Sequence, residues 1–156
     1  MVKARLTLPN TMMRMDGSNH RIVIDADALI ALVNVRDALH ERALQVNARL
    51  IEQQAFVLFP SSAILEAVTK LQRVLSTPAL VEQLLALVFH DKEAIVPVDF
   101  HILNIARSYF NPQASKQNTL FDCAVAAIAS EYGARAIFSF DAWYTKRGFQ
   151  LTEALL

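Results

Sequence analysis

The stretch RIVIDADALIALV, residues 21–33, places two carboxylates between two apolar segments. Residues 22–24 form the short β-branched run that is typical of a buried strand, and residues 26–33 have the apolar content of a buried helix. Asp25 and Asp27 stand where the predicted strand passes into the predicted helix. A buried strand that leads into a helix is the repeating unit of α/β proteins. The stretch therefore predicts a parallel sheet, with Asp25 at the carboxyl end of a strand.

The same alternation of short apolar runs and longer helical periodicities continues along the chain. We predict strands at residues 22–24, 55–59, 94–98, 136–139 and 149–152. We predict helices at residues 26–33, 37–53, 61–75, 78–90, 99–110 and 119–132. The pattern indicates an α/β fold with a parallel sheet covered on both faces and a helical hairpin inserted between the second and third strands.

Size and composition limit what this fold can be. The 156 residues are enough for one domain and too few for two, and 54% hydrophobic with 19% charged residues is a globular composition. No apolar run approaches the roughly 18 residues of a membrane-spanning helix. We expect a polar extension at residues 1–20 and a single domain at residues 21–156. The lone Cys123 excludes an intramolecular disulfide and, without a signal-peptide pattern, predicts a cytoplasmic protein.

Four acidic residues occupy matching places in the predicted alternation. Asp25 and Asp141 each follow a predicted strand, whereas Glu66 and Asp122 lie early in predicted helices. Because parallel strands end at one edge of the sheet, all four side chains can project toward that edge. Each acid taken singly is equally well explained as a helix cap or an exposed residue. Four carboxylates together need a cation, and oxygen ligands of this kind bind Mg²⁺ or Mn²⁺.

A divalent cation held by carboxylates suits the hydrolysis of phosphodiester bonds, because it activates water and neutralises charge on the reacting phosphate. The chain has 15 basic and 15 acidic residues, so without the four site acids 15 basic residues face 11 acidic ones. The candidates for phosphate contacts, which are equally well explained as surface charges, are Lys70, Arg73, Lys116, Lys146 and Arg147. The four histidines show no metal-ligand spacing.

Four segments carry a resemblance to a known family. They are IVIDADALIAL with Asp25, FPSSAILEAVTKL with Glu66, TLFDCAVAAIAS with Asp122, and IFSFDAW followed by RGF with Asp141 and Phe149. In this order, and in a chain of this length, they resemble the PIN-domain ribonucleases, and in size the chain is similar to the short VapC-type toxins. The resemblance covers about residues 21–152.

The resemblance implies a three-layer α/β/α sandwich with a parallel sheet of about five strands. It also implies an endoribonuclease that depends on Mg²⁺ or Mn²⁺. The family roles would fall on Asp25, Glu66, Asp122 and Asp141 as catalytic, metal-binding acids, with Ser139 as a supporting hydroxyl. RNA is then the substrate. The implied protein partners are a second copy of the chain, which forms a homodimer, and an antitoxin that blocks the site.

Asp27 departs from the family pattern, which has Asn, Ser or Thr at that position. Three roles are open to this fifth carboxylate. It joins the metal shell, it adds negative charge near the metal, or it points away as an acid in the first turn of a helix, where the helix dipole stabilises it. We favour the third role.

Two other functions fit part of the sequence. DADAL is similar to the nucleophile motif of HAD-type phosphatases, with Asp25 as nucleophile and Asp27 as acid/base, but Leu29 stands where that motif has Thr or Val. The segment SFDAWYTKRGF also lacks the paired acid of that family. The second alternative is a PIN-like interaction module without turnover. The presence of all four acids favours catalysis.

The predicted helix at residues 78–90 is apolar on two faces. Its two apolar stripes are Leu80, Leu84, Leu87 and Val88, and Val81, Leu85 and Phe89. One stripe is expected to pack on the domain. The other is either buried within the chain as well or faces a second subunit or an antitoxin.

Overall fold

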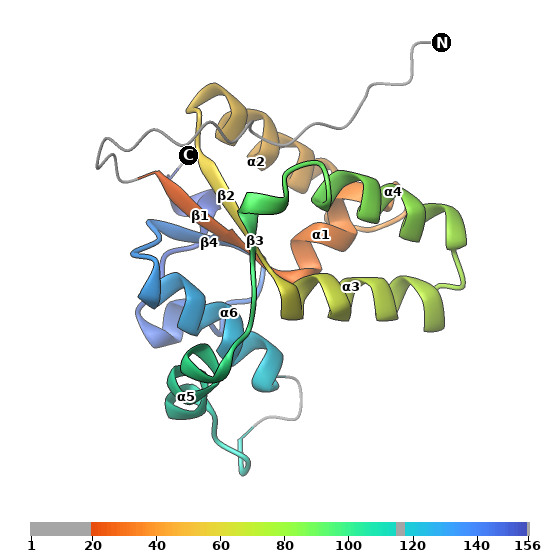
Figure 1. Cartoon of the computed structure of the whole chain (residues 1–156). Coiled ribbons are helices and arrows are strands. Elements are labelled where there is room, and N and C mark those ends of the chain that lie inside the picture. Colours follow the sequence, from red (N-terminus) through yellow and green to blue (C-terminus); the bar gives the residue numbers. More distant parts are fainter. Residues whose placement is uncertain (1–19, 115–117, 156) are drawn as a thin grey trace.

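A parallel sheet forms the centre of the fold (Figure 1). The computed structural model describes residues 20–114 and 118–155, and within them the sheet has four strands in the order β3-β2-β1-β4. The strands are β1 (Arg21–Ile24), β2 (Phe56–Pro60), β3 (Ile95–Val96) and β4 (Ala136–Phe138). Every pairing is parallel, so these strands all end at the same edge of the sheet.

Helices cover both faces of this sheet. They are α1 (Ala26–Val33), α2 (His40–Glu52), α3 (Ser61–Arg73), α4 (Pro78–Val88), α5 (Phe100–Tyr109) and α6 (Leu120–Glu131). Figure 1 shows α1, α2 and α4 on one side of the sheet and α5 and α6 on the other. Within the described ranges, no helix combines the length and the apolar content that crossing a membrane would require. Because helices cover both faces of a parallel sheet, the predicted three-layer α/β/α arrangement is confirmed, with four strands among the described residues instead of about five.

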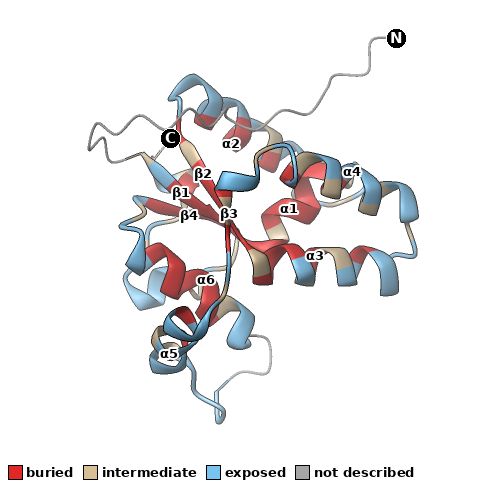
Figure 2. Ribbon diagram, in the orientation of Figure 1, coloured by how far each residue is buried: buried red, intermediate tan, exposed pale blue. Residues whose placement is uncertain are grey.

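The core is built around β1 and the helix that follows it. Val23 of β1 lies opposite Leu58 of β2 and Ile137 of β4, so β1 has a strand on each side. Val23 and Leu29 are both fully buried. Figure 2 shows the buried residues in the sheet and in the parts of the helices next to it. The apolar run before Asp25 is thus the central strand of the domain.

Two predicted strands are shorter than expected. β3 has only two residues, because Ala94 ends a short 3₁₀ helix, η1 (Lys92–Ala94), and Pro97 has no N–H for a sheet hydrogen bond. The predicted strand at residues 149–152 is wrong: it is reduced to a single bridge between Ile137 and Leu151. The chain turns into the 3₁₀ helix η3 (Thr152–Leu155) directly after that bridge.

The predicted helical hairpin is formed by α3 and α4, and one stripe of α4 packs on the domain. Leu84 and Val88 of the first stripe are fully buried, whereas Phe89 of the second is 63% exposed. Val81 is partly buried against the core. The second stripe is therefore only partly covered by the chain itself.

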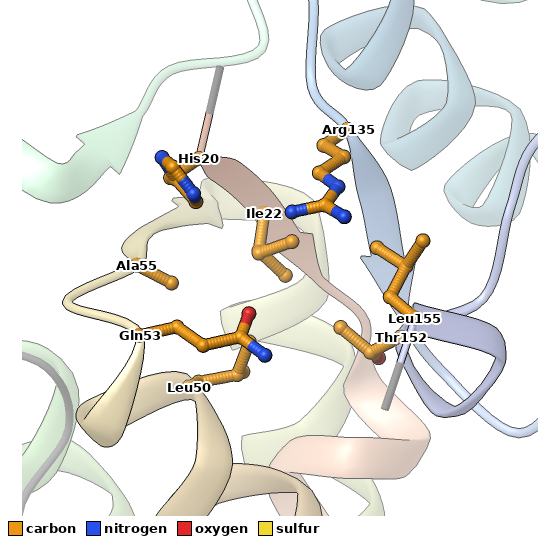
Figure 3. A pocket seen from close by; sticks show the side chains of 8 residues that line it. All are labelled: His20, Ile22, Leu50, Gln53, Ala55, Arg135, Thr152 and Leu155. Carbon is orange, nitrogen blue, oxygen red and sulfur yellow. The ribbon is translucent and has the colours of Figure 1, made fainter. Parts of the chain in front are cut away.

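The opposite edge of the sheet, where the strands begin, has a small pocket (Figure 3). His20, Ala55 and Arg135 line it, and each of them directly precedes a strand. None of the candidate acids lines this pocket. The candidate acids lie at the other edge, where Asp25 directly follows β1 and Asp141 follows β4.

Leu84→Ala should destabilise the protein by about 2–5 kcal/mol, because it leaves a cavity between α4 and the rest of the core. Phe89→Ala is the matched control on the same helix and should change the free energy of unfolding by less than about 1 kcal/mol. Urea unfolding of both variants measures the difference. Equal losses in the two variants would contradict the packing described for α4.

Candidate active site

Asp25 lies at the junction of β1 and α1 with its carboxylate buried. It is the N-cap of α1, and its side chain accepts a hydrogen bond from the backbone N–H of Ala26 at 2.6 Å. The Tyr144 hydroxyl donates to Oδ2 of the same carboxylate at 2.8 Å, and the Ser139 hydroxyl lies 3.4 Å from it. Asp25 is only 4% exposed. A strand end, a helix start and the segment after β4 thus hold one carboxylate between them.

Burial makes the ionised form of Asp25 unfavourable. Removal from water, followed by the charge of Asp27, raises the pKa of Asp25 from 3.8 to about 8. The hydrogen bonds from Tyr144 and Ala26 oppose this increase, and the charge of Asp122 adds to it. Burial and the Asp25 charge also raise the pKa of Tyr144 well above its ordinary value, so its hydroxyl remains a donor.

Asp27 lies in the first turn of α1, as predicted, but its carboxylate does not point away from the site. It accepts hydrogen bonds from the backbone N–H of Phe140 at 2.8 Å and from the Ser139 hydroxyl at 3.0 Å, as well as from Ala28 N–H. The favoured orientation was therefore wrong. Because the partners across the site are on the segment after β4, Asp27 ties that segment to the start of α1. Burial raises the pKa of Asp27, against the lowering effect of these hydrogen bonds.

Asp141 is held by the loops on either side of it. Its Oδ2 accepts a hydrogen bond from the Asn118 side chain at 2.9 Å, and its Oδ1 accepts one from the backbone N–H of Trp143 at 2.8 Å. The backbone N–H of Asp141 donates to the Ser139 hydroxyl oxygen at 3.1 Å. Ser139 is itself buried, so one hydroxyl links the backbone of Asp141 to the carboxylate of Asp27.

Asp122 and Glu66 complete the set of predicted acids. Asp122 is the third residue of α6 and forms a capping box with Thr119, whose backbone N–H lies 2.5 Å from Oδ2. Glu66, on α3, forms an ion pair of 2.7 Å with Lys70 one turn further along. Burial raises the pKa of Asp122, and the charge of Glu66 adds to this increase. Asp122 and Glu66 are therefore close enough to repel each other.

The fold gathers the acids but keeps each one bound to a local donor. Through-space charge effects connect Asp25 with Asp122, Asp122 with Glu66, and Asp27 with Asp141. Among the residues that the structure describes, no three His, Cys, Asp or Glu side chains are arranged as a ready-made metal site. The donor set itself consists of carboxylate oxygens, which is the chemistry that Mg²⁺ and Mn²⁺ prefer. These carboxylates fit such a cation if the side chains of Glu66 and Asp122 exchange their present partners for it.

The predicted phosphate-binding residues are spread around this edge. Lys70 lies at the site through its pair with Glu66, and Arg73 is exposed at the end of the same helix. Lys146 and Arg147 are exposed in the 3₁₀ helix η2 (Thr145–Arg147), where the Arg147 guanidinium lies over the Trp143 ring at 4.9 Å. Lys116 lies outside the described residues.

The comparisons with known proteins agree with this architecture. The profile of the PIN domain family matches residues 22–149, which is most of the chain. The chain belongs to the PIN domain family. The crystal structure of VapC20 from Mycobacterium tuberculosis, described as a toxin that cleaves the sarcin–ricin loop, superposes with a TM-score of 0.67. The two are 20% identical, and the match covers 82% of this chain and 95% of that one. No curated protein matches the chain by sequence.

This PIN domain also contains site residues that the sequence pattern missed. Tyr144 is fully buried and donates to Asp25, and Asn118 donates to Asp141. Neither residue stands in a motif, and each reaches its acid only because distant segments meet at the sheet edge. The available signal was weak: a tyrosine three residues after a predicted site acid. Phe149, which was part of the resemblance, packs against Tyr109 with ring centres 5.9 Å apart.

The raised pKa of Asp25 predicts a stability that depends on pH in the absence of metal. The unfolded-state pKa is about 3.9, so the folded state binds the proton more tightly. The contribution of Asp25 to stability is then fully present below pH 4 and is lost as pH rises through about 8. In EDTA, Asp25→Asn should therefore gain stability relative to wild type as pH rises, by on the order of 2 kcal/mol at pH 8.5.

Urea unfolding at pH 5.5 and pH 8.5 measures this difference. Glu82→Gln, an exposed acid on α4, is the control that removes one carboxylate elsewhere, and its stability should follow wild type at both pH values. A difference between Asp25→Asn and wild type that stays constant across the range would contradict the burial argument.

The bridging role of Asp27 predicts different outcomes for two substitutions. Asp27→Asn retains an oxygen acceptor for Phe140 N–H and the Ser139 hydroxyl, whereas Asp27→Ala leaves both donors without it. Asp27→Ala should lower the free energy of unfolding by about 1–3 kcal/mol, and Asp27→Asn should retain most of the stability. Thermal and urea unfolding distinguish them. Equal losses would show that the charge, not the hydrogen bonds, is what the fold needs.

Proposed function

We propose that this PIN domain is a metal-dependent endoribonuclease. Asp25, Glu66, Asp122 and Asp141 would hold Mg²⁺ or Mn²⁺ at the carboxyl edge of the sheet. The observation that carries the proposal is the buried carboxylate of Asp25, whose pKa is raised to about 8 among further acids. Buried carboxylates that raise one another's pKa are stabilised in the ionised form by a cation, and such perturbed groups gather at functional sites.

In this reaction, neighbouring residues of the chain would hold the carboxylate ligands in position. Tyr144 and the N–H of Ala26 fix the orientation of Asp25 through hydrogen bonds at 2.8 and 2.6 Å. Ser139 and Asn118 fix Asp141 from two sides. A bound Mg²⁺ or Mn²⁺ would supply an activated water molecule and charge neutralisation at the phosphate. The protein would therefore contribute oxygen ligands, of which Asp25 and Asp141 are held in place by hydrogen bonds, and no covalent nucleophile.

RNA phosphates would bind the basic residues around the site. Lys70 lies beside Glu66, Lys146 and Arg147 are exposed in η2, and Arg73 is exposed at the far end of α3. Phosphate contacts from such residues give affinity without sequence selection. Lys116 is proposed to join them on sequence grounds alone.

The likeness to VapC20 supports a finer proposal, that this chain is the toxin of a toxin–antitoxin pair. Its partners would then be an antitoxin that covers the site and a second copy of the chain, in the cytoplasm. The partly covered stripe of α4, with Phe89 63% exposed, is a candidate surface for either protein.

The two alternatives differ in how they fit the site. Membership of the PIN family argues against the phosphatase. The carboxylate of Asp27, which that reaction would need as acid/base, is bound to Phe140 N–H and the Ser139 hydroxyl. The interaction module without turnover has no such conflict. It is distinguished from the nuclease by activity.

The direct test is cleavage of RNA by the purified full chain in Mg²⁺ or Mn²⁺, with EDTA as the negative control. Asp25→Asn and Asp122→Asn should each lower the cleavage rate by about 100-fold or more, because each removes a charged ligand. Glu82→Gln on α4 should cleave like wild type. Circular dichroism verifies folding of every variant. A folded wild-type protein that cleaves no RNA with either metal would favour the interaction module.

A further inference from the structure

Lys70 is a half-exposed cation beside the candidate metal site, paired with one of the proposed ligands. Its Nζ lies 2.7 Å from Oε1 of Glu66, and the Glu66 side chain is only 20% exposed. Burial lowers the pKa of Lys70, but the hydrogen bond and charge of Glu66, together with the charges of Asp25 and Asp122, raise it above its ordinary value. Three of the four proposed ligands therefore act on this one ammonium.

We propose that Lys70 is the counter-cation of the metal-free site, displaced from Glu66 when a divalent cation binds and then free to contact a phosphate of the RNA. This inference rests on the proposed function, because it assigns Lys70 two successive roles at the same site. A general basic surface would only attract RNA, whereas Lys70 would also compete with the metal ion for Glu66.

The competition follows from charge and geometry. A carboxylate oxygen in contact with an ammonium at 2.7 Å has to exchange that partner to bind a metal ion. A cation held by Glu66 would also lie close to the ammonium that now pairs with Glu66, and the two positive charges would repel each other. Metal binding and the Glu66–Lys70 pair therefore oppose each other, and the coupling is reciprocal.

The second role follows from the chemistry of lysine. Its ammonium is a compact charge on a flexible four-carbon chain, so it can leave Glu66 without any movement of α3. The Lys70 side chain is 50% exposed, which leaves it a path toward solvent and toward a bound nucleic acid. After displacement, the ammonium would be within reach of a phosphate held by the cation.

The test measures Mn²⁺ binding to the metal-stripped full chain by isothermal titration calorimetry at low ionic strength. Lys70→Met should bind Mn²⁺ about 3- to 10-fold more tightly than wild type, because a competing positive charge is removed. Lys70→Arg retains the charge and should bind like wild type. Lys92→Met removes the same charge from η1, at the opposite edge of the sheet, and should also bind like wild type.

RNA cleavage at saturating Mn²⁺ tests the second role. Lys70→Met should lower kcat/KM by about 10-fold although its site is fully loaded, and Lys70→Arg should recover most of that loss. Tighter metal binding together with weaker cleavage is a pattern that a merely structural residue would not give. If Lys70→Met cleaves as well as wild type at saturation, the phosphate role is overturned.

Two controls separate this inference from the proposed function. Asp25→Asn should lose Mn²⁺ binding; if wild type binds no Mn²⁺ and cleaves no RNA, the proposed function fails. If wild type binds Mn²⁺ and Asp25→Asn does not, but Lys70→Met binds equally or more weakly, only the competition is overturned. Circular dichroism reports folding, and Lys70→Gln replaces Lys70→Met if the latter unfolds.

Discussion

The contact on which the site depends is the hydrogen bond from the Tyr144 hydroxyl to the buried carboxylate of Asp25. It joins the end of β1 to the segment after β4, and both groups are buried. A buried carboxylate is unfavourable unless donors surround it, so the fold supplies Ala26 N–H on one side and Tyr144 on the other. The position of Asp25 is therefore set by elements more than 100 residues apart in the chain.

The segment after β4 is in turn held by elements outside the sheet. The Arg42 guanidinium on α2 lies 5.2 Å from the centre of the Phe140 ring and forms two hydrogen bonds, at 2.9 and 2.6 Å, with Glu153 of η3. Phe140 N–H donates to Asp27. Helix α2 and the last described residues thus fix the backbone between Ser139 and Asp141. Site geometry depends on packing well away from the acids.

The sequence predicted what local pattern controls. Periodicity placed the helices to within a few residues, and the order of the motifs placed the acids after strands or early in helices. What it missed depends on contacts between distant segments. Whether residues 149–152 continue as a strand depends on the turn into η3, and the direction of the Asp27 side chain depends on Phe140 and Ser139. Tyr144 lies in no motif that could have identified it from the sequence.

Each of the candidate acids has a local hydrogen-bond or ion-pair donor, but these donors do not remove the repulsion between the acids. Thr119 binds Asp122, Lys70 binds Glu66, and Asn118 binds Asp141, so the hydrogen-bonding needs of these oxygens are met without a metal. Asp25 has donors too, yet its raised pKa shows that they do not offset burial and repulsion. Its carboxyl group therefore keeps a proton to a higher pH than an ordinary aspartate does. A divalent cation at this edge would therefore replace that proton, and its binding would strengthen as pH rises.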